Sequence, residues 1–268
     1  MPDTVTTDVS RWTDQGVERS VDEVAREVPV ALTYNRRSHV VMMATPNNLE
    51  DLGLGFSLTE GLAHSAEDIV STRLIPREGG VELAMTVSES CFKRVQAQRR
   101  NMTGRTGCGL CGAESLDQAL RVPGPVARRL AIEHGAVQRA IAHLQDEQAL
   151  QSVTGAVHGA AWCDVRGHIT RVREDVGRHN ALDKLVGALS HSGFDSGNGF
   201  CLVSSRASYE MVYKAAAVGI ELLVAVSAPT ALALEYAQRC GVTLIGFARP
   251  GRHNVYTFPD RINQTRGA

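Results

Sequence analysis

The hydrophobic pattern of the first ninety residues predicts two β-hairpins with a helix between them. Residues 28–34 and 39–45 are rich in strand-forming residues, and the polar stretch between them suits a hairpin connection. Residues 68–75 and 81–87 form a second such pair, with strict alternation of apolar positions in the second arm and a turn that contains two glycines. Apolar residues spaced by three and four between residues 49 and 56 predict the helix.

From residue 135 onward, the pattern predicts helices and strands in alternation. A helix with an apolar stripe comes first, followed by a short hairpin around Arg166 and Gly167 and a second helix over residues 181–189. The remaining pattern is regular: strand 200–203, helix 208–218, strand 222–226, helix 231–238 and strand 242–247. This βαβαβ order is typical of an α/β fold with a mostly parallel sheet.

These patterns divide the chain of 268 residues into three parts. Residues 1–25 are polar and show no periodicity, which predicts a mobile lead-in. The sequence RVPGP at residues 121–125 resembles a linker. We therefore expect a smaller N-terminal β-rich subdomain over residues 26–124 and an α/β domain over residues 125–268.

Composition excludes several classes of protein. Hydrophobic residues make up 43% and charged residues 21% of the chain, as in globular proteins, which excludes wholesale disorder and fibres. The 28 basic and 29 acidic residues give a net charge of −1 and therefore no overall basic field. We expect no nucleic-acid partner.

The sequence also indicates a cytoplasmic protein that does not enter a membrane. The first fifteen residues hold three Asp and one Arg without an apolar block, so we expect no signal peptide. The longest apolar stretch, residues 219–229, contains Glu221 and is too short to span a bilayer. Six cysteines are too sparse for a disulfide scaffold, and reduced thiols are the better interpretation.

A basic, glycine-rich segment carries the candidate chemistry. Residues 91–113 contain five cations and no acid, and their second half, NMTGRTGCGLCG, predicts a mobile loop with Cys108 and Cys111. The same letters include the dinucleotide pattern G-x-G-x-x-G. No buried strand precedes it, so we interpret that match as chance.

A C-x-x-C pair has three possible uses. A structural zinc site needs four ligands, and no second pair has the required spacing, so we expect no metal. A dithiol redox couple is possible, although no strand precedes the pair as it does in thioredoxin-like folds. A nucleophilic thiol is favoured, because nearby cations lower the pKa of a cysteine. A solvated basic helix followed by an incidental cysteine pair is the alternative without chemistry.

Three polar clusters in the C-terminal part are candidate anion sites. Residues 173–180 precede a helix, residues 204–208 (SSRAS) lie between a strand and a helix, and residues 247–252 (FARPGR) follow a strand. Hydroxyls, guanidinium groups and free backbone N–H groups hold phosphates at such positions. Each cluster also has an ordinary explanation, as a helix cap or a solvated surface.

Taken together, these residues resemble the formate dehydrogenase accessory sulfurtransferase family. The resemblance extends from about Val28 to Arg261 and rests on TGCGLCG, REDVGRHNALDKLVG, SSRASYEMVYKAAAVGI, SAPT and GFARPGRHNVYT, in that order. The chain departs from the family at Ser205, where we expect Gly, which puts close approach of a ligand to that backbone in question.

The resemblance implies a homodimeric cytoplasmic sulfurtransferase whose C-terminal domain has a cytidine-deaminase-like fold. A cysteine desulfurase would pass sulfur to Cys108 as a persulfide, with Cys111 in a supporting role. The sulfur would then reach the molybdenum of bis(molybdopterin guanine dinucleotide) before this cofactor enters formate dehydrogenase. GDP would mimic the cofactor, whose expected contacts are Ser204, Arg206, Ser208, Arg178, His179 and the loop Phe247, Ala248, Arg249, Pro250, Gly251 and Arg252.

Other functions make different demands on the sequence. Zinc deaminases need H-x-E followed by P-C-x-x-C, but His158 is followed by Gly-Ala-Ala and the C-x-x-C pair lies upstream. We therefore expect the deaminase fold without its chemistry. A non-catalytic chaperone for the cofactor would use the anion-binding loops and leave Cys108 without a role.

Overall fold

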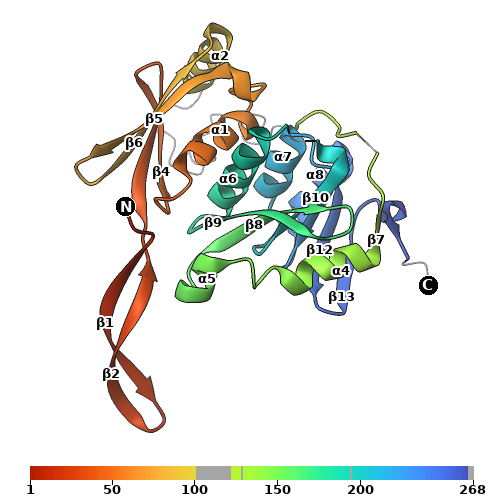
Figure 1. The fold of residues 1–268 in the computed structure, drawn as a ribbon. Coiled ribbons are helices and arrows are strands. Elements are labelled where there is room, and N and C mark those ends of the chain that lie inside the picture. Colours follow the sequence, from red (N-terminus) through yellow and green to blue (C-terminus); the bar gives the residue numbers. More distant parts are fainter. Residues whose placement is uncertain (101–121, 128, 194, 265–268) are drawn as a thin grey trace.

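Two β-sheets with helices packed between them organise the chain (Figure 1). The computed structural model describes residues 1–100, 122–127, 129–193 and 195–264. The smaller sheet has the strand order β4-β3-β6-β5, and the larger one has the order β13-β12-β11-β10-β8-β9. The fold is therefore mixed α/β.

The N-terminal elements follow the predicted order. They are β3 (Val28–Tyr34), β4 (Arg37–Ala44), α1 (Leu49–Thr59), β5 (Ile69–Arg77), β6 (Gly80–Val87) and α2 (Glu89–Arg100). Both predicted hairpins are confirmed, and β3 also pairs with β6 in parallel. The apolar positions of alternate residues, such as Leu32 and Leu83, bury one face of this sheet together with Leu52 of α1.

The C-terminal elements confirm the predicted βαβαβ order. They are β7 (Ile132–Glu133), α4 (His134–His143), α5 (Ala149–Thr154), β8 (His158–Asp164), β9 (Ile169–Asp175), α6 (Arg178–Ser190), β10 (Gly199–Val203), α7 (Tyr209–Ala217), β11 (Leu222–Ala225), α8 (Ala231–Cys240), β12 (Thr243–Arg249), β13 (Arg252–Val255) and β14 (Ile262–Asn263). Short 3-10 helices cover Ala66–Asp68, Ser196–Asn198 and Pro259–Arg261. Strands β10, β11 and β12 are parallel, whereas β8, β9 and β13 join the sheet antiparallel.

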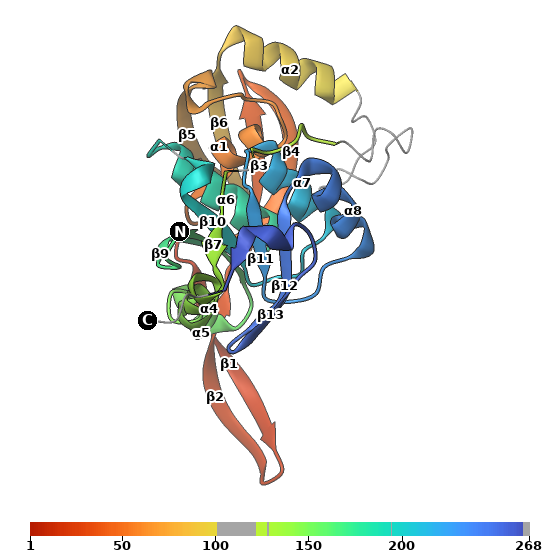
Figure 2. The same ribbon diagram turned by 90° about the vertical axis from the view of Figure 1, so that its right-hand side faces the viewer.

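Both faces of the larger sheet are covered. Helices α6, α7 and α8 pack on one face, and α4 packs on the other (Figures 1 and 2). This cover explains why the parallel strands are apolar at nearly every position. No helix among the described residues is long and apolar enough to cross a membrane.

Helices α1 and α6 connect the two parts of the chain at very short range. A Cβ atom on Gly55 would lie 1.7 Å from the Asp183 carbonyl oxygen, and one on Gly187 would lie 2.0 Å from the Asp51 carbonyl oxygen. Only glycine permits this approach, so the two backbones pack directly against each other.

The first 25 residues differ from the expectation of a lead-in without regular structure. They form a long antiparallel hairpin of β1 (Thr4–Thr13) and β2 (Gly16–Ala25), which projects from the rest of the chain (Figures 1 and 2). Both faces are largely exposed, and Trp12 near the turn keeps 79% of its surface. Without a buried face, the strands lack the apolar alternation that would have predicted them.

The predicted loop with Cys108 and Cys111 lies outside the described residues. Its mobility therefore remains a prediction, as does the likeness of the C-terminal domain to cytidine deaminases. Helix α2 precedes this loop in the sequence and contains the first half of the basic segment.

Candidate functional site

Two loops and the bulged end of β12 meet at the carboxyl edge of the parallel strands. The Ser227 N–H donates to the Ser205 carbonyl oxygen at 3.4 Å, and the Phe247 N–H donates to the Ser227 carbonyl oxygen at 3.0 Å. These contacts join the loops that follow β10 and β11 to Phe247 near the end of β12. Open α/β sheets bind ligands at this edge, so two of the three predicted clusters lie where a ligand site is expected.

The amino-terminal ends of α6 and α7 lie at the same edge. His158 begins β8 and pairs with Asp175 at the end of β9, immediately before α6. In the first turns of the two helices, His179 Nε2 lies 2.8 Å from Glu210 Oε2, and an Arg178 nitrogen lies 3.8 Å from the same oxygen. The predicted residues Arg178 and His179 are thus brought to the edge, together with Glu210, which sequence reasoning missed.

The charges of this edge favour an anion. Burial alone would raise the pKa of Glu210, but His179, Arg178 and Lys214 lower it below the usual value. Arg206 is exposed and forms no ion pair with any described residue. Within the same described set, Ser208 Oγ and Arg178 Nε are buried without a hydrogen-bond partner. Helix N-termini add a positive end to these donors.

Two of the three serines in the 204–208 loop form side-chain hydrogen bonds within the protein, and the third, Ser208, stands at the start of a helix. Ser204 Oγ accepts the Gly159 N–H at 2.9 Å, which fixes the loop to β8. Ser205, the departure from the resembled family, is only 4% exposed, and its hydroxyl donates to the Arg206 carbonyl oxygen at 3.0 Å. Its side chain therefore lies within its own loop. Ser208 stands at the N-cap of α7 without a capping hydrogen bond from its side chain.

Residues 247–252, expected to follow a strand as a loop, instead include the end of β12, a two-residue turn and the first residue of β13, so the segment begins at this edge and continues beyond it. Phe247 has a left-handed backbone (φ 49°) and is 45% exposed, at a bulge between Gly246 and Arg249. Arg249 and Arg252 are exposed and pair across the β12–β13 turn. Among the described residues, no hydrogen bond or ion pair joins either arginine to the 204–208 loop.

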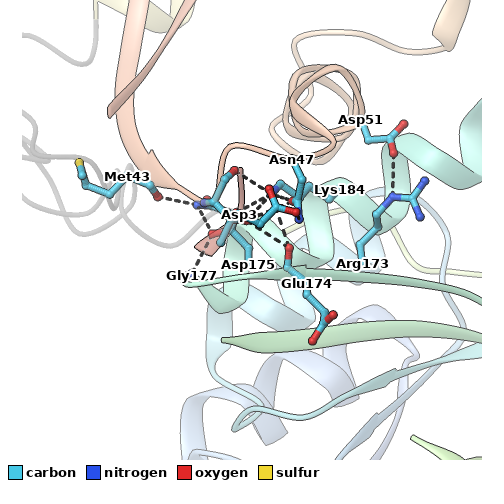
Figure 3. Close-up of polar contacts among 11 residues, drawn as sticks. Asp3, Met43, Asn47, Asp51, Arg173, Glu174, Asp175, Gly177 and Lys184 are labelled. Atoms are coloured by element: carbon cyan, nitrogen blue, oxygen red, sulfur yellow. Dashed lines mark hydrogen bonds and ion pairs between the residues drawn. The ribbon is translucent and has the colours of Figure 1, made fainter. Parts of the chain in front are cut away.

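Most of the 173–184 motif has a structural role instead of a ligand-facing one. Figure 3 shows Asp175 and Lys184 beside Asn47, which comes from the N-terminal part of the chain. Lys184 Nζ lies 2.7 Å from Asp175 Oδ2, and both side chains are fully buried. Lys184 also donates to Thr45 Oγ1 at 2.7 Å and to Asn47 Oδ1 at 2.9 Å. The predicted crowding of polar groups thus partly reflects a contact between the two sheets.

A second buried cluster strengthens the same contact. Lys214 of α7 lies 2.9 Å from Asp183 of α6 and 2.8 Å from Glu60, which follows α1. Burial would lower the pKa of Lys214, but the two carboxylates raise it well above its usual value. Asp183 also accepts from Thr59 Oγ1 at 2.7 Å. No sequence pattern predicts the contacts with Thr59 and Glu60, because these residues lie more than 120 positions from their partners.

The four described cysteines are unsuited to nucleophilic chemistry. All four, Cys91, Cys163, Cys201 and Cys240, are buried as free thiols. Burial raises the pKa of each, to about 11 for Cys91 and about 12 for Cys201. Such thiols stay protonated at neutral pH. No metal-binding cluster of His, Cys, Asp or Glu occurs in the part of the chain that the structure describes.

We expect His158 to make folding stability sensitive to mild acid. Burial, with Arg178 and His179 nearby, lowers the pKa of His158 below 6.5, so the folded state binds its proton less readily than the unfolded state does. Its contribution is complete above pH 6.5 and is lost as the pH falls toward the folded-state pKa. Between pH 7.5 and 5.5, the urea midpoint should therefore fall less for His158→Gln than for the wild type. The exposed control His64→Gln should follow the wild type; equal falls in all three proteins would contradict this role.

Comparison with known proteins shows the family to which the chain is similar. The FdhD/NarQ family model matches residues 25–263. A sulfur carrier protein FdhD from Cupriavidus necator is 52% identical over 254 residues, covering 95% of this chain and 88% of that protein. A protein of the same name from Bordetella petrii is 49% identical over 247 residues, covering 92% and 89%.

A solved structure shares the fold. It is assigned as a formate dehydrogenase accessory protein from Desulfotalea psychrophila and is 24% identical, with a TM-score of 0.77. The superposition covers 98% of this chain and all of that one. The family match over nearly the whole length and the high identity to its members lead to one conclusion: the chain belongs to the FdhD/NarQ family.

Proposed function

We propose that this protein is a cytoplasmic, homodimeric sulfur carrier that serves formate dehydrogenase. The observation that carries the proposal is its 52% identity, over 95% of its length, to a sulfur carrier protein FdhD. A sulfur carrier needs a reactive thiol. Because the four described cysteines are buried and have raised pKa values, Cys108 and Cys111 are the thiols left for this task.

The first step is sulfur transfer from a cysteine desulfurase to Cys108. The Cys108 thiolate attacks the outer sulfur of the persulfide on the desulfurase. A new S–S bond forms on Cys108 while the S–S bond of the donor breaks, and the donor cysteine leaves as a thiolate. No net oxidation occurs in this exchange, which follows ordinary thiol–disulfide chemistry. The five cations of residues 91–113 favour the attacking thiolate.

Cys111 supplies a balanced second step. Its thiolate attacks the inner sulfur of the Cys108 persulfide, so that a Cys108–Cys111 disulfide forms and the outer sulfur leaves as hydrosulfide. The two electrons that reduce this sulfur come from the cysteine pair, and a cellular dithiol reductant then restores both thiols. The released sulfide is the form that a molybdenum centre accepts as a ligand.

The cargo in this proposal is bis(molybdopterin guanine dinucleotide), and its guanine nucleotide portion binds at the carboxyl edge of the larger sheet. Support comes from Arg206, which forms no ion pair with the described residues, from the buried donors Ser208 Oγ and Arg178 Nε, and from the exposed Arg252. Guanidinium groups and helix N-termini suit its phosphates. Together with Phe247, these residues give the edge both anion-binding groups and an exposed aromatic ring.

GDP affinity tests the location of this cargo site. Arg206→Ala and Arg252→Ala should each weaken GDP binding by about 1.5–3 kcal/mol, because each removes a charge-assisted phosphate contact. Calorimetric titration measures the affinity, and Arg19→Ala, an exposed arginine of the β1–β2 hairpin, is the control. Unchanged affinity in both site variants would exclude this edge as the guanine nucleotide site.

Two other functions would need different parts of the protein. A non-catalytic chaperone would need the cargo site without Cys108, and a dithiol redox protein would need the cysteine pair without the cargo site. The test is complementation of a bacterial strain that lacks its own sulfur carrier of this family. The sulfur-carrier proposal requires both sites for restored formate dehydrogenase activity, so restoration without either one would contradict it.

A further inference from the structure

One side chain of helix α4 holds the turn of the β12–β13 hairpin. The Gly251 N–H donates to Gln138 Oε1 at 2.7 Å, and Gln138 Nε2 lies 2.8 Å from His253 Nδ1. Gln138 thus contacts both the turn and the strand that follows it. We call residues 247–252 the cargo loop and the Gln138 contacts with Gly251 and His253 the clamp.

The first half of the cargo loop is anchored by Ala248, which is fully buried in the core, whereas Pro250 and Gly251 at its turn are exposed. The register of β12 and β13 shifts between Gly246 and Arg249, and beyond that bulge the strands keep only the pair Arg249 and Arg252. At its start, the loop is bound to the carboxyl edge through the Phe247 N–H and the Ser227 carbonyl oxygen. The clamp is the corresponding attachment at its far end.

Helix α4 is a rigid support for the clamp. Its apolar side packs into the core beneath the larger sheet through buried residues, namely Ala136, Val137, Ala140 and Ile141. A side chain on a packed helix is held more firmly than one on a loop. Gln138 therefore holds Gly251 and His253 at a fixed position relative to the core.

The hydrogen bonds also define the protonation state of His253. A backbone N–H can only donate, so the Gln138 oxygen must face Gly251 and its amide nitrogen must face His253. The amide nitrogen can only donate, and His253 Nδ1 must therefore accept. A protonated imidazole has no acceptor nitrogen, so it cannot form this contact.

We propose that Gln138 is a positioning residue for the cargo loop and that it holds the loop only while His253 is neutral. This inference rests on the proposed guanine nucleotide site. The affinity of the cargo site should therefore fall in mild acid because the loop loses its support, while the groups that contact the ligand stay unchanged.

The surroundings of His253 keep the clamp closed at neutral pH. Burial lowers the pKa of His253 below 6.5, and His134 of α4, whose ring centroid lies 4.9 Å away, lowers it further. Arg249 and Arg252 add positive charge on the same hairpin. No carboxylate forms an ion pair with His253 among the described residues. The imidazole is therefore neutral at pH 7.5 and becomes protonated only as the pH falls below the usual histidine value of 6.5.

GDP titrations of clamp variants test the proposal. At pH 7.5, Gln138→Ala should weaken GDP binding about fivefold, the effect of one hydrogen bond, while Gln145→Ala on a neighbouring exposed turn should leave it unchanged. His253→Asn keeps an acceptor oxygen near the Nδ1 position and does not titrate. It should match the wild type at pH 7.5 and bind about fivefold more tightly than the wild type at pH 5.

A carboxylate in place of the amide should remove the sensitivity to acid. In Gln138→Glu, the side chain accepts from both the Gly251 N–H and a protonated His253. The ratio of its affinity to that of His253→Asn should therefore stay constant from pH 7.5 to 5. Because GDP itself titrates in this range, the ratios between variants at each pH are the measured quantity. Equal pH profiles for the wild type and His253→Asn would overturn the proposal.

Amide hydrogen exchange separates failure of the clamp from failure of the cargo site. Without GDP, the Gly251 N–H should exchange slowly in the wild type and His253→Asn, and several times faster in Gln138→Ala. Unchanged Gly251 protection in Gln138→Ala would overturn the clamp whatever GDP does. Faster exchange with unchanged GDP affinity would overturn the positioning role, whereas a wild-type protein that binds no GDP would contradict the proposed cargo site itself.

Discussion

A Cys108→Ser variant is expected to restore no formate dehydrogenase activity in a strain that lacks its own sulfur carrier of this family. Cys108 is closer in sequence than Cys111 to Arg105, and it corresponds to the persulfide cysteine in the resembled motif. A nearby cation favours the reactive thiolate. Removing this sulfur removes the atom that carries the cargo, so we expect loss of activity to background.

Cys111→Ser is the matched control for this prediction. It changes the same atom in the same predicted loop but leaves the carrier thiol in place, and an external thiol can then release the sulfur more slowly. We expect partial activity, with unchanged thermal stability and GDP affinity in both variants. Full activity of Cys108→Ser, with sulfur accepted at Cys111, would show that the two roles are reversed.

Lys184→Met should destabilise the fold more than any surface substitution. The change removes the ammonium group 2.7 Å from Asp175 and leaves a fully buried carboxylate without its counterion. It also removes the contacts of Lys184 with Thr45 and Asn47, which join the two parts of the chain. Breaking one side of a buried ion pair typically costs about 3–5 kcal/mol. Urea unfolding followed by circular dichroism measures this loss.

The exposed ion pair of Lys93 and Glu89 is the control for the buried ion pair of Lys184 and Asp175. Lys93 lies 2.7 Å from Glu89 on the surface of α2, with both side chains largely exposed. Lys93→Met should cost at most about 0.5 kcal/mol. The double variant Asp175→Asn/Lys184→Met should be more stable than Lys184→Met alone, because no unpaired charge remains. Similar small losses for Lys184→Met and Lys93→Met would contradict the stabilising role of the buried pair.

The secondary structure was predictable wherever one face of an element is buried. The strands of the smaller sheet and the βαβαβ order of the larger one follow from apolar periodicity, which burial enforces. The β1–β2 hairpin has no buried face, so its residues carry no such pattern. Strand β13 was missed because its exposed and half-buried residues, from Arg252 to Val255, resemble a polar tail.

The site was predictable only in part, because polar residues do not show in sequence which way they face. Within residues 173–184, Arg178 and His179 face the carboxyl edge, whereas Asp175 and Lys184 face the N-terminal part of the chain. The difference depends on Thr45, about 130 residues away. Glu210 was missed because one acid in the first turn of a helix is also a common stabiliser of helix N-termini.

The central claim is that Cys108 carries sulfur as a persulfide, and intact-protein mass spectrometry tests it most directly. The purified protein is incubated with a cysteine desulfurase and cysteine and then measured under non-reducing conditions, beside Cys108→Ser and Cys111→Ser. The account predicts a gain of one sulfur, about 32 Da, in the wild type and Cys111→Ser, reversible by a thiol reductant and absent from Cys108→Ser. A wild-type protein that gains no mass, or a Cys108→Ser variant that gains as much as the wild type, would contradict it.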